Sequence, residues 1–256
     1  MEFIDTHAHL YAAEFNDDIN EVVQRAKSEQ VKRIYLPNID IDSIELMKKL
    51  VDNHPDLFYP MMGLHPCYVT KDYKNQLEVI ASTFEQQDFV AVGEIGIDLY
   101  WDKTLLTEQQ AVFEQQVQWS IDKKLPFVIH ARDSFQEIFD VLRNFNPAEL
   151  KGVFHCFTGT IKDYETIKTL GDFKIGIGGV VTYKKSTLPA VLEEVPLRDV
   201  VLETDAPYLT PTPFRGKRNE SSYLTYIAEK LASIYQCSLT HIAKTTSANA
   251  ITLFGN

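Results

Sequence analysis

A repeating pattern constrains the fold of this chain more than any other feature: short apolar, β-prone runs alternate with amphipathic helical stretches. The β-prone runs end 23 to 36 residues apart, near His9, Asn38, His65, Glu94, His130, His155, Gly178 and Asp205. This spacing is typical of consecutive βα units. A (β/α)8 barrel of eight such units takes about 250 residues. We therefore predict one α/β domain over residues 1–256, folded as a (β/α)8 TIM barrel.

Apolar stripes at helical spacing predict the intervening helices. They lie within residues 19–26, 44–51, 113–121, 135–142 and 164–170, and a further helix is expected around 223–235. Residues 107–110, Thr-Glu-Gln-Gln, predict a capping box before one of them. The alternative fold is an open doubly wound sheet. No G-x-G-x-x-G follows an early strand, so a Rossmann dinucleotide site is not supported.

Composition limits the classes of function. The formal net charge of −11 argues against a surface that coats nucleic acid broadly, although a local cationic site is compatible with it. The three cysteines have no C-x-x-C spacing, which fits a reducing compartment. The chain contains no apolar run of 18 residues, and its first residues resemble a core strand rather than a signal peptide. We expect a cytoplasmic protein that does not bind membranes.

Residues of metal-ligand type gather at the predicted strand ends. Five of the seven histidines lie there, together with two carboxylates: His7, His9, His65, His130, His155, Glu94 and Asp205. Barrel active sites occupy the rim formed by these ends. On a strand of period two, Phe3, Asp5, His7 and His9 would share one face, and Glu94 would share its face with Val92. His54 and His241 fall outside the predicted rim and are interpreted as structural or exposed.

The ligand set indicates two divalent metal ions. Four histidines and two carboxylates (His7, His9, His130, His155, Glu94 and Asp205) exceed what one ion with an open position needs. A shared carboxylate can bridge two ions, and Glu94 lies between the first-strand pair and the later histidines. Imidazole ligands favour Zn, Mn or Fe, with Mg not excluded.

Other residues near the rim have predicted supporting roles. Arg132 could hold a phosphate through its planar guanidinium, or form a surface salt bridge. Glu203 shares a predicted face with Asp205 and could align a ligand histidine. Aromatic side chains in the strand-end loops could stack on nucleobases, or pack within their loops: Tyr68, Trp101, Phe157, Tyr183, Tyr208 and Phe214.

The chain resembles the TatD family of metal-dependent deoxyribonucleases, within the amidohydrolase-like barrels. The resemblance rests on ordered motifs along nearly the whole chain: FIDTHAHL at 3–10, GLHP at 63–66, GEIGID at 93–98, IHAR at 129–132, FHCFTG at 154–159, LETDAPYL at 202–209, RGKRNE at 215–220 and TSANAITLFG at 246–255. One departure is Ser221, where the family often has proline.

The resemblance implies a role for each matching residue. His7 and His9 would bind one metal with Asp205, His130 and His155 would bind the second, and Glu94 would bridge them. Asp205 would also orient or deprotonate the attacking water, and His65 would contact the scissile phosphate or the water on the metal. Catalytic roles therefore fall on Asp205, Glu94 and His65. Substrate contacts are predicted for His65 from the resemblance, and for Arg132 and Tyr208 from their place at the rim.

These features predict a hydrolase in which a metal-activated hydroxide cleaves phosphodiester bonds at single-stranded DNA ends. The family resemblance implies an exonuclease. A metal-dependent ester or amide hydrolase, such as a D-aminoacyl-tRNA deacylase, is the alternative, because the same chemistry attacks those bonds. A non-catalytic metal-binding barrel is a third possibility, although no ligand is missing from the sequence. No obligate protein partner is evident.

Overall fold

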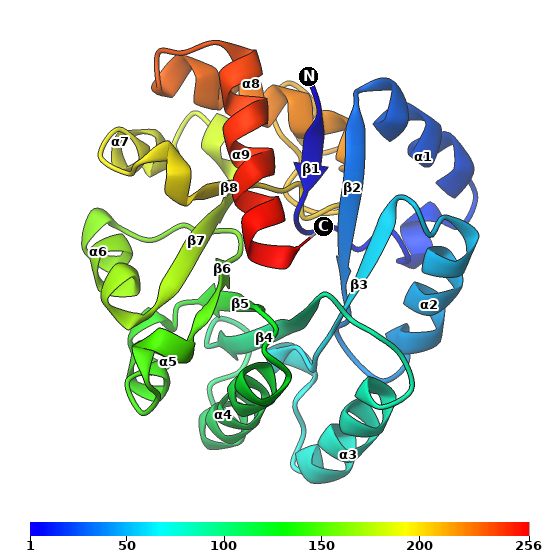
Figure 1. Ribbon diagram of the computed structural model, residues 1–256, viewed down its shortest axis with the longest axis vertical. Coiled ribbons are helices and arrows are strands. Elements are labelled where there is room, and N and C mark those ends of the chain that lie inside the picture. Colours follow the sequence, from blue (N-terminus) through cyan, green and yellow to red (C-terminus); the bar gives the residue numbers. More distant parts are fainter. Residues whose placement is uncertain (256) are drawn as a thin grey trace.

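The protein folds as eight parallel strands in a nearly closed barrel with helices between them, the predicted architecture (Figure 1). The computed structural model describes residues 1–255. The strands are β1 (Phe3–Asp5), β2 (Val31–Pro37), β3 (Phe58–Met62), β4 (Ala91–Asp98), β5 (Phe127–Arg132), β6 (Lys151–Phe154), β7 (Asp172–Ile177) and β8 (Val200–Leu202). Each pairs in parallel with the next in chain order.

Nine α-helices lie outside the strands within the described residues. They are α1 (Ile19–Ser28), α2 (Ser43–Asn53), α3 (Tyr73–Phe84), α4 (Leu106–Lys123), α5 (Phe135–Leu142), α6 (Ile161–Leu170), α7 (Leu188–Leu192), α8 (Leu224–Ile234) and α9 (Leu239–Phe254). Within residues 1–255, none of the helices combines the length and the hydropathy that a membrane-spanning segment needs. The predicted capping box is wrong, because α4 begins at Leu106 and places Thr107 inside the helix.

Backbone hydrogen bonds between the first and last strands complete the barrel beyond their short paired segments. The amide of Thr6 donates to the carbonyl of Leu202 at 2.9 Å, and that of Asp205 donates to the carbonyl of His7 at 2.8 Å. A bridge between Ala8 and Ala206 continues this seam. The loops that carry His7, His9 and Asp205 are therefore held side by side.

The hydrophobic core has two parts. The larger part contains the apolar side chains between strands and helices. The smaller part lies inside the barrel, because it joins one residue from each of seven strands to the last helix: Ile4, Tyr35, Met61, Ala91, Val128, Val153 and Val201 pack with Ala250, Leu253 and Phe254. In Figure 1, α9 lies over one end of the barrel, and its residues Ala250, Leu253 and Phe254 belong to this part of the core. Apolar side chains thus fill the interior of the barrel below the rim that carries the predicted ligands.

The prediction that alternate residues share a face is wrong in β1 and in β4. Strand β1 ends at Asp5, so Phe3 packs in the outer core while His7, four residues on, faces the rim. In β4 the register shifts between Val92 and Ile95. Val92 consequently packs in the outer core, and Glu94 points into the histidine group instead of sharing a face with Val92.

Close packing of β4 against β5 gives a stability prediction. Gly96 pairs with His130, has φ +144°, and a Cβ there would lie 2.0 Å from the His130 carbonyl oxygen. Gly96→Ala should lower the free energy of unfolding by about 2–4 kcal/mol, because it adds both overpacking and backbone strain. Gly216 also has a positive φ, +85°, but no atom lies within 4 Å of the place that a Cβ would take there. Urea denaturation should show a much smaller loss for Gly216→Ala; equal losses would contradict the steric explanation.

Candidate metal centre

The six predicted ligands come together at the carboxyl ends of the strands. Glu94 lies in the middle of β4, His130 lies near the end of β5, and His155 directly follows β6. His7, His9 and Asp205 lie in the loops that join across the barrel seam. All but two of these side chains are nearly inaccessible; those of His130 and Asp205 are 17% and 13% exposed. Water can therefore reach the group at these two residues.

Glu94 is the centre of the arrangement, and its two oxygens face different partners. Oε2 lies 3.1 Å from Nε2 of His7 and 3.5 Å from Nε2 of His9. The same two imidazole nitrogens lie 3.8 and 3.5 Å from Oδ1 of Asp205. His7 and His9 thus meet one oxygen of Glu94, and Asp205 meets the same two nitrogens, which forms the first half of the site.

The other oxygen of Glu94 faces the second half. Oε1 lies 3.0 Å from Nδ1 of His130 and 3.2 Å from Nε2 of His155. Nε2 of His65 lies 3.4 Å away. The rings of His7 and His155 stack with their centroids 3.7 Å apart, which brings the two halves into contact.

In His9 and His130, a hydrogen-bond partner on the outer side of the ring determines whether the nitrogen that faces Glu94 carries a proton. The hydroxyl of Tyr11 donates to the carbonyl of Pro37 and so accepts from Nδ1 of His9 at 3.0 Å. A neutral His9 therefore has an unprotonated Nε2 facing Glu94. Asp98 accepts from Nε2 of His130 at 2.8 Å, so a neutral His130 has an unprotonated Nδ1 facing Glu94.

His65 differs from these two histidines. The amide of Cys67 donates to Nδ1 of His65 at 3.1 Å, so this nitrogen must accept. In the neutral ring Nε2 then carries the proton and donates toward Glu94. His65 consequently offers a hydrogen-bond donor at the rim, whereas His9 and His130 offer lone pairs.

Glu203 lies beneath the second half of the site. It is fully buried, and its Oε1 accepts from the amide of Cys156 at 2.5 Å. The same oxygen lies 3.2 Å from Nδ1 of His155, without the alignment of a hydrogen bond. A Cβ at Gly176 would lie 2.1 Å from Oε2, so glycine makes room for this carboxylate.

The electrostatics of the group keep both central carboxylates ionised. Burial alone would raise the pKa of Glu94, but the nearby His65, His7 and His155 outweigh it and hold that pKa well below its usual range. Burial would likewise raise the pKa of Asp205, but the neighbouring His9, His155 and His7 outweigh it and lower that pKa overall. Burial lowers the pKa of His7, so its ring is neutral near pH 7.

The donor set fits divalent metal ions. Nitrogen and oxygen ligands of one tetrahedral ion, each about 2.0–2.2 Å from it, lie about 3.3–3.6 Å apart. The contacts of 3.1–3.8 Å between His7, His9, Glu94 and Asp205 are close to this spacing. Such a concentration of facing lone pairs is costly unless a cation compensates it.

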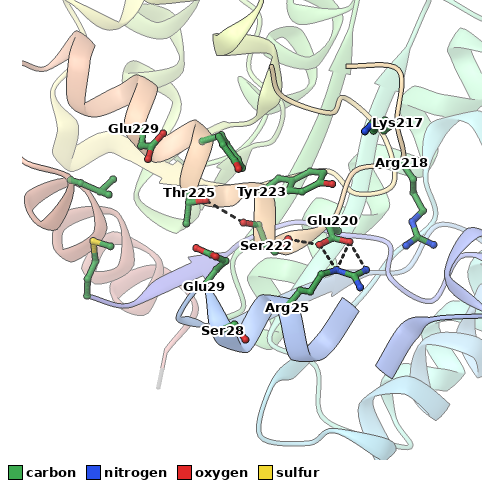
Figure 2. Close-up of a pocket in the computed structure, with 13 residues that line it drawn as sticks. Arg25, Ser28, Glu29, Lys217, Arg218, Glu220, Ser222, Tyr223, Thr225 and Glu229 are labelled. Carbon is green, nitrogen blue, oxygen red and sulfur yellow. Dashed lines mark hydrogen bonds and ion pairs between the residues drawn. The ribbon is translucent and has the colours of Figure 1, made fainter. Parts of the chain in front are cut away.

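The loop after β8 is fixed next to Asp205 by the RGKRNE motif. The side-chain amide of Asn219 donates hydrogen bonds to the carbonyl oxygens of Thr204 and Tyr208, each with an N···O distance of 2.7 Å. Glu220 pairs with Arg25 of α1 at 2.7 Å. Both residues line a cavity of about 840 Å³ whose lining includes none of the predicted ligands (Figure 2). Ser221, the departure from the family pattern, donates to Asp5 at 2.6 Å. These residues therefore hold the loop in place.

The predicted substrate residues lie around the group. Tyr208 is 53% exposed, and its ring centroid is 6.1 Å from that of His9. The guanidinium of Arg132 stacks on Tyr100 at 3.8 Å, and within residues 1–255 it makes no ion pair, so the predicted alternative of a surface salt bridge is wrong. Two of the predicted base-stacking residues are used in packing: Phe157 is 2% exposed, and Phe214 stacks on Tyr223 at 4.5 Å.

Sequence reasoning missed two residues of this site. Asp98 and Tyr11 orient His130 and His9, and nothing in the motifs predicted these roles. Asp98 ends the GEIGID segment, so its place on the same strand as Glu94 was a usable signal. Tyr11 follows His9 by two residues in a loop, where no periodicity indicates its direction.

Comparisons of sequence and of structure both match this chain to proteins of one family. Residues 4–255 match the family described as TatD related DNase. An uncharacterized metal-dependent hydrolase of Bacillus subtilis, YabD, is 36% identical over 251 residues, with 98% of each chain covered. The crystal structure of YjjV, a TatD homologue from Escherichia coli K12, superimposes with a TM-score of 0.91 at 30% identity, covering 99% of this chain and 98% of the other. A TatD family hydrolase from Entamoeba histolytica shares the fold, with a TM-score of 0.84 at 22% identity, covering 99% and 98%.

Proposed function

The chain belongs to the TatD related DNase family of metal-dependent hydrolases, and from this we propose that it is a deoxyribonuclease that hydrolyses phosphodiester bonds at single-stranded DNA ends. The observation that carries the proposal is the arrangement of Glu94, whose two oxygens each face a separate set of ligand-type side chains. This arrangement suits two cations held about one carboxylate.

The proposal assigns the ligands to two ions. His7, His9 and Asp205 would hold one with Oε2 of Glu94, and His130 and His155 would hold the other with Oε1. When bound, divalent ions lower the pKa of water and neutralise charge on phosphoryl oxygens. Zn, Mn, Mg and Fe all remain candidates for this donor set.

Asp205 acts as the general base in this proposal. Its side chain is 13% exposed whereas that of Glu94 is 2% exposed, so Asp205 is the carboxylate that an attacking water can reach. Its lowered pKa keeps it ionised and able to accept the proton. Glu203 would hold His155 in place, and Asp98 would do the same for His130.

The substrate is held by donors and aromatic rings around the centre. His65 offers its Nε2–H, and Arg132 offers a guanidinium with no ion pair within residues 1–255, which suits a phosphate. Tyr208 offers an exposed ring beside His9. A strand end needs few phosphate contacts, which agrees with the net charge of −11.

The test of this function is to remove metal from the protein with a chelator, add metal back, and measure cleavage of single-stranded DNA. Single-stranded DNA cleavage should be lost on chelation and should recover at least about a hundredfold when Mg, Mn or Zn is added. An Asp205→Asn sample purified in parallel controls for contaminating nuclease. The panel should include D-aminoacyl-tRNA and a simple phosphodiester. Deacylation without cleavage of DNA would replace this function with the ester-hydrolase alternative, and equal cleavage with and without metal would refute both.

A further inference from the structure

Exposed aromatic side chains of this protein are confined to the rim of the barrel. Four aromatic side chains are exposed within residues 1–255, and all follow the carboxyl ends of strands: Tyr68, Tyr100, Trp101 and Tyr208. Trp101 is the most exposed of them at 70%, and Tyr100 is 54% exposed. Exposed rings gathered at one site indicate a surface that binds a ligand.

The turn that carries Tyr100 and Trp101 is rigidly mounted. Oδ1 of Asp98 accepts from the amides of Tyr100 and Trp101 at 2.9 and 3.1 Å. The amide of Asp98 in turn donates to Gln109 of α4 at 2.9 Å. These contacts fix the backbone of the turn, and both rings are exposed to solvent.

The same Asp98 connects this turn to the candidate metal centre. Its Oδ2 accepts from Nε2 of His130 at 2.8 Å while its Oδ1 holds the turn. One carboxylate therefore contacts both a predicted metal ligand and the backbone of the turn that carries the exposed rings. A ligand that stacks on the rings lies at a defined place relative to the reacting bond.

A cation accompanies the rings. The guanidinium of Arg132 lies 3.8 Å from the ring centre of Tyr100 and 5.4 Å from that of Trp101. Within residues 1–255 it makes neither an ion pair nor a side-chain hydrogen bond. An exposed indole beside an unpaired guanidinium matches a nucleobase beside a phosphate.

We propose that Tyr100 and Trp101 form a nucleobase-stacking subsite, fixed by Asp98 relative to His130, that takes an unpaired base near the bond being cleaved. This inference rests on the proposed function, because it identifies where that function's substrate binds. Tyr, Trp and Arg are also frequent in protein interfaces. The link through Asp98 to His130 favours a ligand of the centre itself.

Oligonucleotides with and without terminal bases test the subsite. The measurement is the ratio of kcat/KM for oligo(dT) to that for the same oligomer with abasic tetrahydrofuran sugars at its ends. Trp101→Ala should lower this ratio by about 5- to 150-fold, the effect of losing one stacked base. Trp101→Phe, which keeps a ring, should restore most of it. Leu46→Ala, an exposed substitution on α2, should leave the ratio at the wild-type value.

A binding measurement separates this inference from the proposed function. The chain has two tryptophans, so Trp119→Phe leaves Trp101 as the only indole. In the presence of chelator, oligo(dT) should quench its fluorescence and the abasic oligomer should quench it much less. Quenching without any nuclease activity would overturn the proposed function but keep the subsite. An unchanged ratio in Trp101→Ala, or equal quenching by both oligomers, would overturn the subsite.

Discussion

Glu94→Gln is expected to leave a folded protein that has lost its metal ions and at least about a thousandfold of its turnover on single-stranded DNA. Glu94 is 2% exposed, and its two oxygens face His7 and His9 on one side and His130 and His155 on the other. Glutamine keeps the volume but removes the charge. It also replaces one acceptor oxygen with an NH2 group that can only donate.

Elemental analysis and steady-state kinetics on the same sample measure both losses, and circular dichroism checks the fold. The matched control is Glu45→Gln on α2, because the side chain of Glu45 is 82% exposed. It should retain metal and turnover. A Glu94→Gln protein with two bound ions and wild-type turnover would refute the bridging role.

Asp205→Asn should separate proton transfer from metal binding. The asparagine oxygen can still act as a ligand, but the side chain cannot accept a proton at neutral pH. Turnover should therefore fall by about 10²–10⁴-fold, the usual contribution of a general base, while most of the metal remains bound. This outcome differs from that of Glu94→Gln, where metal and turnover are lost together.

The measurement is kcat on single-stranded DNA at saturating metal, with metal content determined in parallel. Asp172→Asn is a suitable control, because the side chain of Asp172 is 69% exposed at the start of β7. Equal turnover by Asp205→Asn and the wild-type protein would show that the base is another group.

The fold was predictable from sequence because its signal is local and repeated. Apolar runs and amphipathic stretches recur at the spacing of βα units, and the strands end within about four residues of the predicted positions. The six ligand-type residues were found by the same route, since parallel strands bring their carboxyl ends to one rim.

Departures from regular strand geometry were not predictable. The register shift in β4 turns Val92 outward and Glu94 inward, and β1 ends before the His7–His9 pair. A rule of period two describes only regular strands, so it fails where pairing with a neighbouring strand changes the register. Phe157 shows the same limit, since a ring in a loop becomes part of the core only through distant contacts.

The sequence by itself determined the barrel, the rim and the chemical identity of the side chains that meet there. Only the tertiary structure decided how those side chains face one another. Tyr11 and Asp98 determine which ring nitrogens of His9 and His130 are free, and Cys67 makes His65 a donor instead. The physical reason is that strand order follows from patterns along the chain, whereas the direction of each hydrogen bond depends on partners that folding brings together from other segments.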